Sequence, residues 1–219
     1  VDHYFTYHHD QKLLKAIQTA EQLCFSKGLT TLADAGLPLK ECLYLDSLGK
    51  AAQRRIFLYM MLTPEQAAIQ FAKSKGLYEN QFSQIASFKL YADGALGSRG
   101  AKLKKDYCDR AHHNGYWVSS KSMLQAFCQD IYKNTNYQIN THCIGDSANI
   151  LLLDLYGQQL KGPNDRRWRI EHAQLVEPKD RALFKQFSII PSVQPTHATS
   201  DAPWVNARIC DNRMASAYA

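Results

Sequence analysis

Three residues that could share one site lie in or near the ends of three apolar, strand-like runs. Lys89 lies inside the run at residues 88–92, which the dipeptide Asp-Gly ends. His142 and His172 lie near the ends of two later runs, in the motifs INTHCIGD and RIEHAQ. Lysine is rarely buried, and neutral imidazole is the commonest protein ligand for zinc-like metals. We therefore expect Lys89, His142 and His172 to converge on one point.

The chemistry of Lys89 has several open interpretations. Burial lowers the pKa of a lysine, and a neutral amine can react with CO₂ to give a carbamate, a carboxylate-like ligand that can bridge two metal ions. Alternatively, Lys89 pairs with Asp93 or extends its charged end to solvent. A third possibility is a Schiff-base nucleophile in a metal-independent enzyme. By strand alternation, Glu171 is expected to face the helices or to pair with Arg169.

Helical and strand-like patterns alternate along the whole chain. Alternation of this kind predicts βα units and a parallel sheet, and no glycine-rich nucleotide motif follows the first strand. A (β/α)₈ barrel has eight strands and places functional side chains at their carboxyl ends. We therefore predict an α/β fold, a partial (β/α)₈ TIM-type barrel with flanking helices that lacks its first and last units. The six expected strands are residues 30–33, 54–62, 88–92, 137–143, 167–172 and 187–193.

Helix-start signals and one long loop complete the expected framework. Ser119 and Ser120 are expected to cap a helix that extends to about Asn134, and Asp146 is either a helix cap or a catalytic group. Residues 94–118 form a long irregular segment, of a kind that is often functional. Open barrel edges at the second and seventh strands are expected to expose unpaired backbone, which could join two copies of the chain.

Composition excludes some classes of protein. The chain has 219 residues, 45% of them hydrophobic, a formal charge of +6 and no apolar run long enough to cross a membrane. Its basic residues are scattered, so nucleic-acid binding has little support. The six cysteines have no CxxC or metal-type spacing. They indicate reduced, mostly buried thiols and a cytoplasmic location.

Four ordered motifs together resemble a known family. The motifs are KLYADGALGSRGA, THCIGD, RIEHAQ and SVQPTH followed by SD and W. They resemble the amidohydrolase superfamily, and more narrowly its amidohydrolase-3 branch, which is related to formamide deformylases and D-aminoacylases. The resemblance spans residues 28–218. It implies a barrel that hydrolyses C–N bonds of small amide-type substrates with one or two divalent metal ions, which we expect to be zinc.

The resemblance also implies roles for particular residues. Lys89 matches the carboxylated lysine of the fourth strand that bridges two metals. His142 and His172 match the metal-binding histidines of strands five and six. Asp93, Arg99 and His197 lie in motifs that are expected to shape the substrate pocket.

Two parts of the family pattern are missing. No HxH pair of the first strand is present, and the chain stops at Ala219, before the eighth-strand aspartate that acts as general base. Residues 1–219 are therefore expected to be one incomplete barrel domain, an internal segment of a longer protein, that is inactive alone. The alternative is a non-catalytic binding or interaction domain on a barrel scaffold.

Overall fold

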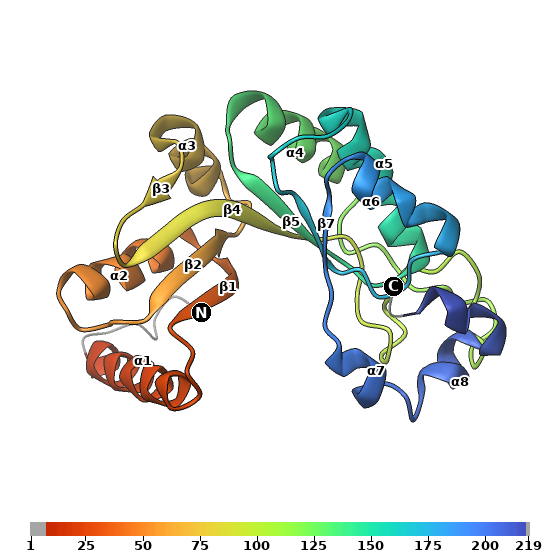
Figure 1. The fold of residues 1–219 in the computed structure, drawn as a ribbon, viewed down its shortest axis with the longest axis horizontal. Coiled ribbons are helices and arrows are strands. Elements are labelled where there is room, and N and C mark those ends of the chain that lie inside the picture. The colour runs from red at the N-terminus through yellow and green to blue at the C-terminus, as the bar shows by residue number, and fades with distance from the viewer. Residues whose placement is uncertain (1–7, 218–219) are drawn as a thin grey trace. The chain divides into compact units, whose positions relative to one another are not determined.

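The computed structural model describes residues 8–217 (Figure 1). They divide into two compact units, and the boundary lies between Ser87 and Phe88 in the sequence. The first unit comprises residues 8–87 of the described chain. Its elements are α1 (His8–Ser26), β1 (Thr31–Leu37), α2 (Leu39–Lys50), β2 (Phe57–Leu62), α3 (Gln66–Lys75), β3 (Tyr78–Glu79) and the start of β4 (Ser83–Tyr91). β1 and β2 pair in parallel, and the short β3, which the sequence did not predict, pairs antiparallel with β4.

The second unit, residues 88–217, holds the rest of β4 and the later βα units. These are α4 (Lys121–Asn134), β5 (Gln138–Cys143), α5 (Asp146–Leu160), β6 (Arg169–His172), α6 (Ala182–Gln186) and β7 (Ile190–Ser192). Three short helices come after the last βα unit: α7 (Thr196–Ser200), α8 (Val205–Ile209) and the 3₁₀ helix η2 (Asp211–Ser216). Another 3₁₀ turn, η1 (Pro178–Asp180), precedes α6.

The sheet confirms the predicted fold class. Its strand order is β1-β2-β4-β5-β6-β7, so consecutive βα units lie side by side as in a (β/α)₈ barrel. β1 and β7 lie at the two ends of this order, where open edges were expected. We conclude that the chain forms a partial TIM-type barrel of six strands with flanking helices.

Alternation along β4 explains how the second unit presents Lys89. Phe88 and Leu90 are buried, and the Phe88 ring packs against Phe127 of α4 and Tyr137. Because successive side chains of a strand point to opposite faces, Lys89 points away from this helix-covered face. Figure 1 shows α4 and α5 on the same side of β5. Of the two serines expected to cap α4, Ser120 is the cap, and its Oγ accepts the Met123 N–H at 3.2 Å.

One sequence-based expectation about the cysteines is wrong. Cys108 and Cys210 form a disulfide across 102 residues, whereas Cys42, Cys128 and Cys143 are buried free thiols as expected. The chain folds back so that the segment before α4 meets the end of α8, and this contact is invisible in the spacing of cysteines. The disulfide removes the cysteine-based argument for a cytoplasmic location.

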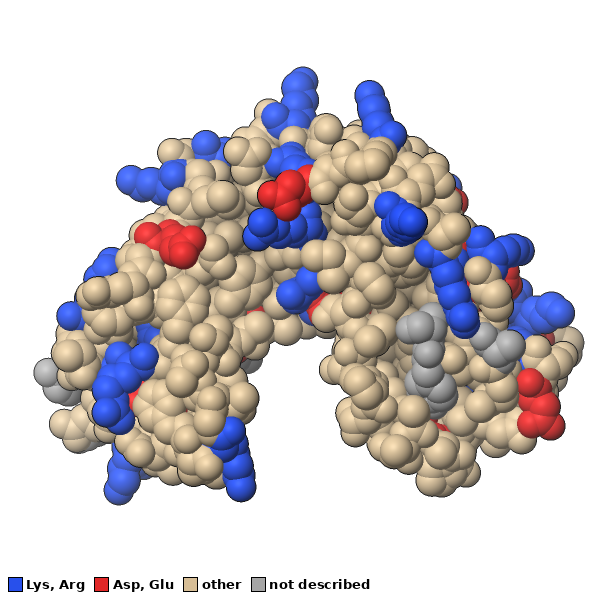
Figure 2. Space-filling view, in the orientation of Figure 1, with Lys and Arg blue, Asp and Glu red and all other residues tan. Residues whose placement is uncertain are grey.

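Two further findings concern the distribution of surface charge and the absence of membrane-spanning helices among the described residues. On the face shown in Figure 2, Lys and Arg side chains are spread among other residues and form no single stripe. Among residues 8–217, no helix combines the length and apolar character that crossing a membrane requires.

Candidate functional site

Lys89 is a buried lysine with few partners. The residue is only 4% exposed, and its Nζ lies 3.9 Å from the centroid of the Tyr91 ring. Within the described part of the chain, no acceptor forms a hydrogen bond with this ammonium group. Burial lowers the pKa of Lys89, and the charge of Glu171 acts in the opposite direction. The surroundings of Lys89 therefore favour its neutral amine over the ammonium form.

The two predicted histidines lie beside each other. The ring centroids of His142 and His172 are 4.6 Å apart, with the planes at 74°. Burial, followed by the neighbouring His172, lowers the pKa of His142 to about 4. Burial also lowers the pKa of His172, and the charge of Lys89 acts on both rings in the same direction. Both imidazoles are thus neutral near pH 7 and keep a lone pair, and the structure brings them close to Lys89.

The backbone at His172 explains how it reaches His142. The β5–β6 register pairs His142 with Glu171 and pairs His172 with the buried Cys143. Regular alternation would therefore direct His172 away from His142. Instead, His172 has a φ of 72° and the next residue, Ala173, has a φ of 43°. These values are uncommon for residues other than glycine, and such strain is concentrated at functional sites.

Glu171 is the residue that sequence reasoning placed least well. Its carboxylate pairs with Arg169 Nε at 2.8 Å, which confirms one of the two expected arrangements. The other expectation, that Glu171 faces the helices, is wrong because its register partner is His142. Glu171 is also the anion with the largest influence on the Lys89 pKa. The expectation took His172 to follow regular alternation, and the positive φ at His172 that breaks this alternation has no sequence signal.

Asp93 is a buried connector next to His142. Its carboxylate accepts three backbone N–H groups, from Lys102 at 2.8 Å, Ile144 at 3.0 Å and Gly145 at 2.8 Å. Its Oδ1 lies 3.6 Å from His142 Nε2. Burial raises the pKa of Asp93 to about 7, although these N–H groups oppose the shift. Asp93 therefore joins the segment after β4 to the turn before α5 and does not hydrogen-bond Lys89.

The other two predicted pocket residues differ in their placement. The His197 ring stacks on His172, with 5.7 Å between centroids and 26° between planes. Arg99 instead forms a two-pronged ion pair with Asp109, at 2.9 and 2.8 Å, and Asp109 also pairs with Arg208. His197 thus adjoins the cluster of Lys89, His142 and His172, whereas Arg99 is engaged within the segment before α4.

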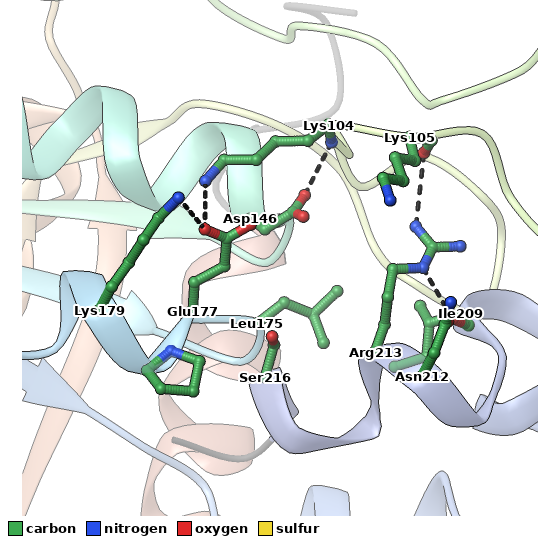
Figure 3. A pocket seen from close by; sticks show the side chains of 11 residues that line it. Lys104, Lys105, Asp146, Leu175, Glu177, Lys179, Ile209, Asn212, Arg213 and Ser216 are labelled. Carbon is green, nitrogen blue, oxygen red and sulfur yellow. Dashed lines mark hydrogen bonds and ion pairs between the residues drawn. The ribbon is translucent and has the colours of Figure 1, made fainter.

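A separate pocket of about 510 Å³ lies elsewhere in the second unit (Figure 3). Figure 3 shows Lys104 and Lys179 directed at the Glu177 carboxylate, at 3.0 and 2.9 Å. Leu175 and Ile209 also line it. None of the six predicted site residues is among its lining residues, so this pocket is distinct from the histidine cluster.

Comparisons with known proteins show the family to which the chain belongs. The family model described as "Amidohydrolase family" matches residues 5–219. The chain belongs to the amidohydrolase family. This amidohydrolase segment is 31% identical over 214 residues to Protein LONG AFTER FAR-RED 3 of Arabidopsis thaliana, covering 91% of the chain and 36% of that protein. It is 27% identical over 213 residues to putative amidohydrolase YtcJ of Bacillus subtilis (strain 168), covering 94% of the chain and 39% of that protein.

Two solved structures share the fold of the amidohydrolase segment. Both are of uncharacterized metal-dependent hydrolases. The Pyrococcus furiosus protein matches with a TM-score of 0.82 and 24% identity, covering 99% of this chain and 44% of that one. The Pyrococcus horikoshii OT3 protein matches with a TM-score of 0.80 and 26% identity, covering 94% and 41%. The chain therefore spans less than half the length of these relatives.

Proposed function

We propose that this amidohydrolase segment contributes Lys89, His142 and His172 to a divalent-metal centre that hydrolyses amide-type C–N bonds in small molecules. The observation that carries the proposal is the buried Lys89 ammonium, which has no hydrogen-bond acceptor among the described residues and lies near two neutral histidines. Zinc is the metal we favour, as one or two ions. Histidine and carboxylate ligands also suit other first-row metals.

The chemistry of these three side chains fits such a metal. Among residues 8–217, no three His, Cys, Asp or Glu side chains are grouped to bind one ion. Lys89 supplies the missing donor if its neutral amine adds to CO₂, which forms an N–C bond, releases a proton and leaves a carbamate. Two imidazoles and one carbamate are a hard-to-intermediate donor set that zinc accepts. A divalent metal bound there supplies Lewis-acid activation of an amide carbonyl and of water.

The chain's own residues have positioning roles in this proposal. Asp93 holds the segment after β4 against the turn before α5, and this places His142 beside Lys89. Burial keeps both imidazoles neutral, so each retains a lone pair for the metal. His197, stacked on His172, and Asp93 border the substrate position. Arg99 acts there only indirectly, through the Asp109 pair that fixes the segment before α4.

We further propose that residues 1–219 alone do not turn over substrate. The family's first-strand HxH pair and eighth-strand aspartate have no counterpart in this sequence, so the segment lacks the family's general base. The non-catalytic binding alternative makes the same prediction for the segment, but it requires no metal.

The test compares the segment with a version extended by its flanking gene sequence to the length of its relatives. We expect the extended protein to contain zinc and to hydrolyse N-acyl or formamide substrates, and we expect Lys89→Ala to abolish both properties. His113→Ala, which changes a histidine outside the cluster, serves as the control. An extended protein that is folded but binds no metal supports the binding-domain alternative instead.

A further inference from the structure

The His172 ring is held from outside its own strand by Gln194. The Oε1 atom of Gln194 forms a hydrogen bond with Nδ1 of His172. A carbonyl oxygen can only accept, so Nδ1 of the neutral ring carries the proton. The lone pair is then on Nε2, the nitrogen on the other side of the ring.

His142 is held in the opposite way and provides an internal comparison. Its Nε2 lies 3.4 Å from the Gly94 carbonyl oxygen and 3.6 Å from Asp93 Oδ1. The Gly94 carbonyl oxygen can only accept, so the proton of His142 is on Nε2. The two neighbouring rings therefore carry their protons on different nitrogens, each specified by a different neighbour.

Gln194 is placed to act as a brace because His172 lacks the support of regular strand geometry. The φ of 72° at His172 takes its side chain out of the alternation that orients other β6 residues. Gln194 lies between β7 and α7, and its own carbonyl accepts the His197 N–H at 3.0 Å. The same short turn thus supplies both the acceptor for Nδ1 and the His197 ring that stacks on His172.

We propose that Gln194 is a positioning residue that fixes the Nδ1–H tautomer of His172 and presents its Nε2 to the metal. The inference rests on the metal centre proposed above and adds a residue outside the ligand set. Ligand histidines ordinarily donate their second N–H to such a partner, and losing that partner typically costs ten- to a hundredfold in metal affinity. Because Gln194 is exposed, we expect a loss near the lower limit, about tenfold.

The first measurement reads the tautomer without metal. Long-range ¹H–¹⁵N spectra of the histidine-labelled, metal-free chain at pH 8 should show His172 protonated on Nδ1. Gln194→Leu should reduce the Nδ1–H population of His172 and leave His142 unchanged. Gln194→Glu, which keeps the acceptor, should retain it. The matched control is Gln186→Leu, which alters an exposed glutamine on α6.

The second measurement reads zinc affinity by chelator competition in bicarbonate buffer. Gln194→Leu should weaken zinc binding about tenfold, whereas Gln194→Glu and Gln186→Leu should change it less than threefold. The inference is overturned if His172 carries its proton on Nε2. It is also overturned if Gln194→Leu changes neither the tautomer of His172 nor the zinc affinity. A tautomer that follows Gln194 in a chain that binds no zinc instead overturns the metal centre.

Discussion

The two units differ in the hydrogen-bond partners of their buried charged side chains. In the first unit, Arg54 is 1% exposed and donates hydrogen bonds to the carbonyl oxygens of Leu45, Ile56 and Phe82 and to Ser83 Oγ. In the same unit, burial acts to raise the pKa of Asp46, but hydrogen bonds led by Lys50 and Tyr78 outweigh it and lower the pKa. Buried charges there are surrounded by partners that stabilise them.

The second unit buries Lys89 without comparable partners. Its ammonium contacts the face of an aromatic ring, and the nearest influential anion, Glu171, already pairs with Arg169. An unpaired buried charge costs free energy of folding, so it is retained where it serves a purpose. The comparison fits a stabilising role for Arg54 and the chemical role that we propose for Lys89. The following predictions test this contrast.

The largest effect is expected at Arg54. Arg54→Met leaves three backbone carbonyls without their buried donor and should lower the free energy of unfolding by about 4 kcal/mol. Urea unfolding monitored by circular dichroism measures the change. Arg55→Met, at a side chain that is 64% exposed, should cost less than about 1 kcal/mol. Equal losses in the two variants would contradict the structural role of Arg54.

The disulfide gives the next largest effect and should be confined to the second unit. Cys108→Ser opens a covalent loop of about a hundred residues and should cost about 3 kcal/mol under oxidising conditions. Hydrogen exchange should accelerate in the segment before α4 and in α8, and the exchange of β1 and β2 should not change. Cys24→Ser, which alters a free cysteine, is the control. Faster exchange throughout the first unit would show that the units are not separate in this respect.

Substitution of Lys89 should change the free energy of unfolding in the opposite direction to substitution of Arg54. Lys89→Met removes an uncompensated buried charge and should raise the free energy of unfolding of the metal-free chain by about 1 kcal/mol. The same urea experiment measures it. A loss of stability as large as that of Arg54→Met would mean that Lys89 is a structural residue, and the contrast between the units would fail.

The smallest effect is expected in the pH dependence of the free energy of unfolding, to which His142 and Asp93 contribute in opposite directions. The pKa of His142 is lowered to about 4, so the unfolded chain binds this proton first and His142 makes stability fall as pH decreases from about 6.5 to 4. The pKa of Asp93 is raised to about 7, so the folded chain binds that proton first and Asp93 makes stability rise as pH decreases from about 7 to 4. The two slopes oppose each other in the metal-free chain, and the lowered pKa of His172 adds to the His142 slope.

Single variants should separate the two slopes. In His142→Asn, the change of stability between pH 7 and pH 4.5 should shift in the stabilising direction relative to the unaltered chain, because only His172 then opposes the Asp93 contribution. In Asp93→Asn, stability should decrease over the same interval. Thermal unfolding at several pH values gives the sign in each case, and parallel profiles for both variants would refute this assignment.

The sequence predicted the framework and the central cluster for physical reasons that act locally. Apolar runs and helix signals are set by neighbouring residues, and they located the strands that carry Lys89, His142 and His172. The direction of Glu171 was predicted wrongly, because His172 was assumed to follow regular strand alternation and its positive φ breaks that alternation.

Long-range contacts were also beyond the sequence. The pairing of Cys108 with Cys210, and of Asp109 with Arg208, depends on how an irregular segment folds back on α8. The hydrogen-bond partners of Arg54 in the first unit were not predicted either, because the acceptors come from three separate segments of the chain.

The most direct test of the central claim is whether Lys89 becomes a carbamate when zinc binds. ¹³C spectra of the chain in ¹³C-bicarbonate with zinc should show one carbamate signal that disappears in Lys89→Met and persists in the control Lys12→Met. Zinc binding should weaken in parallel with the loss of that signal. Zinc binding without a carbamate signal, or a signal that survives Lys89→Met, would contradict the account.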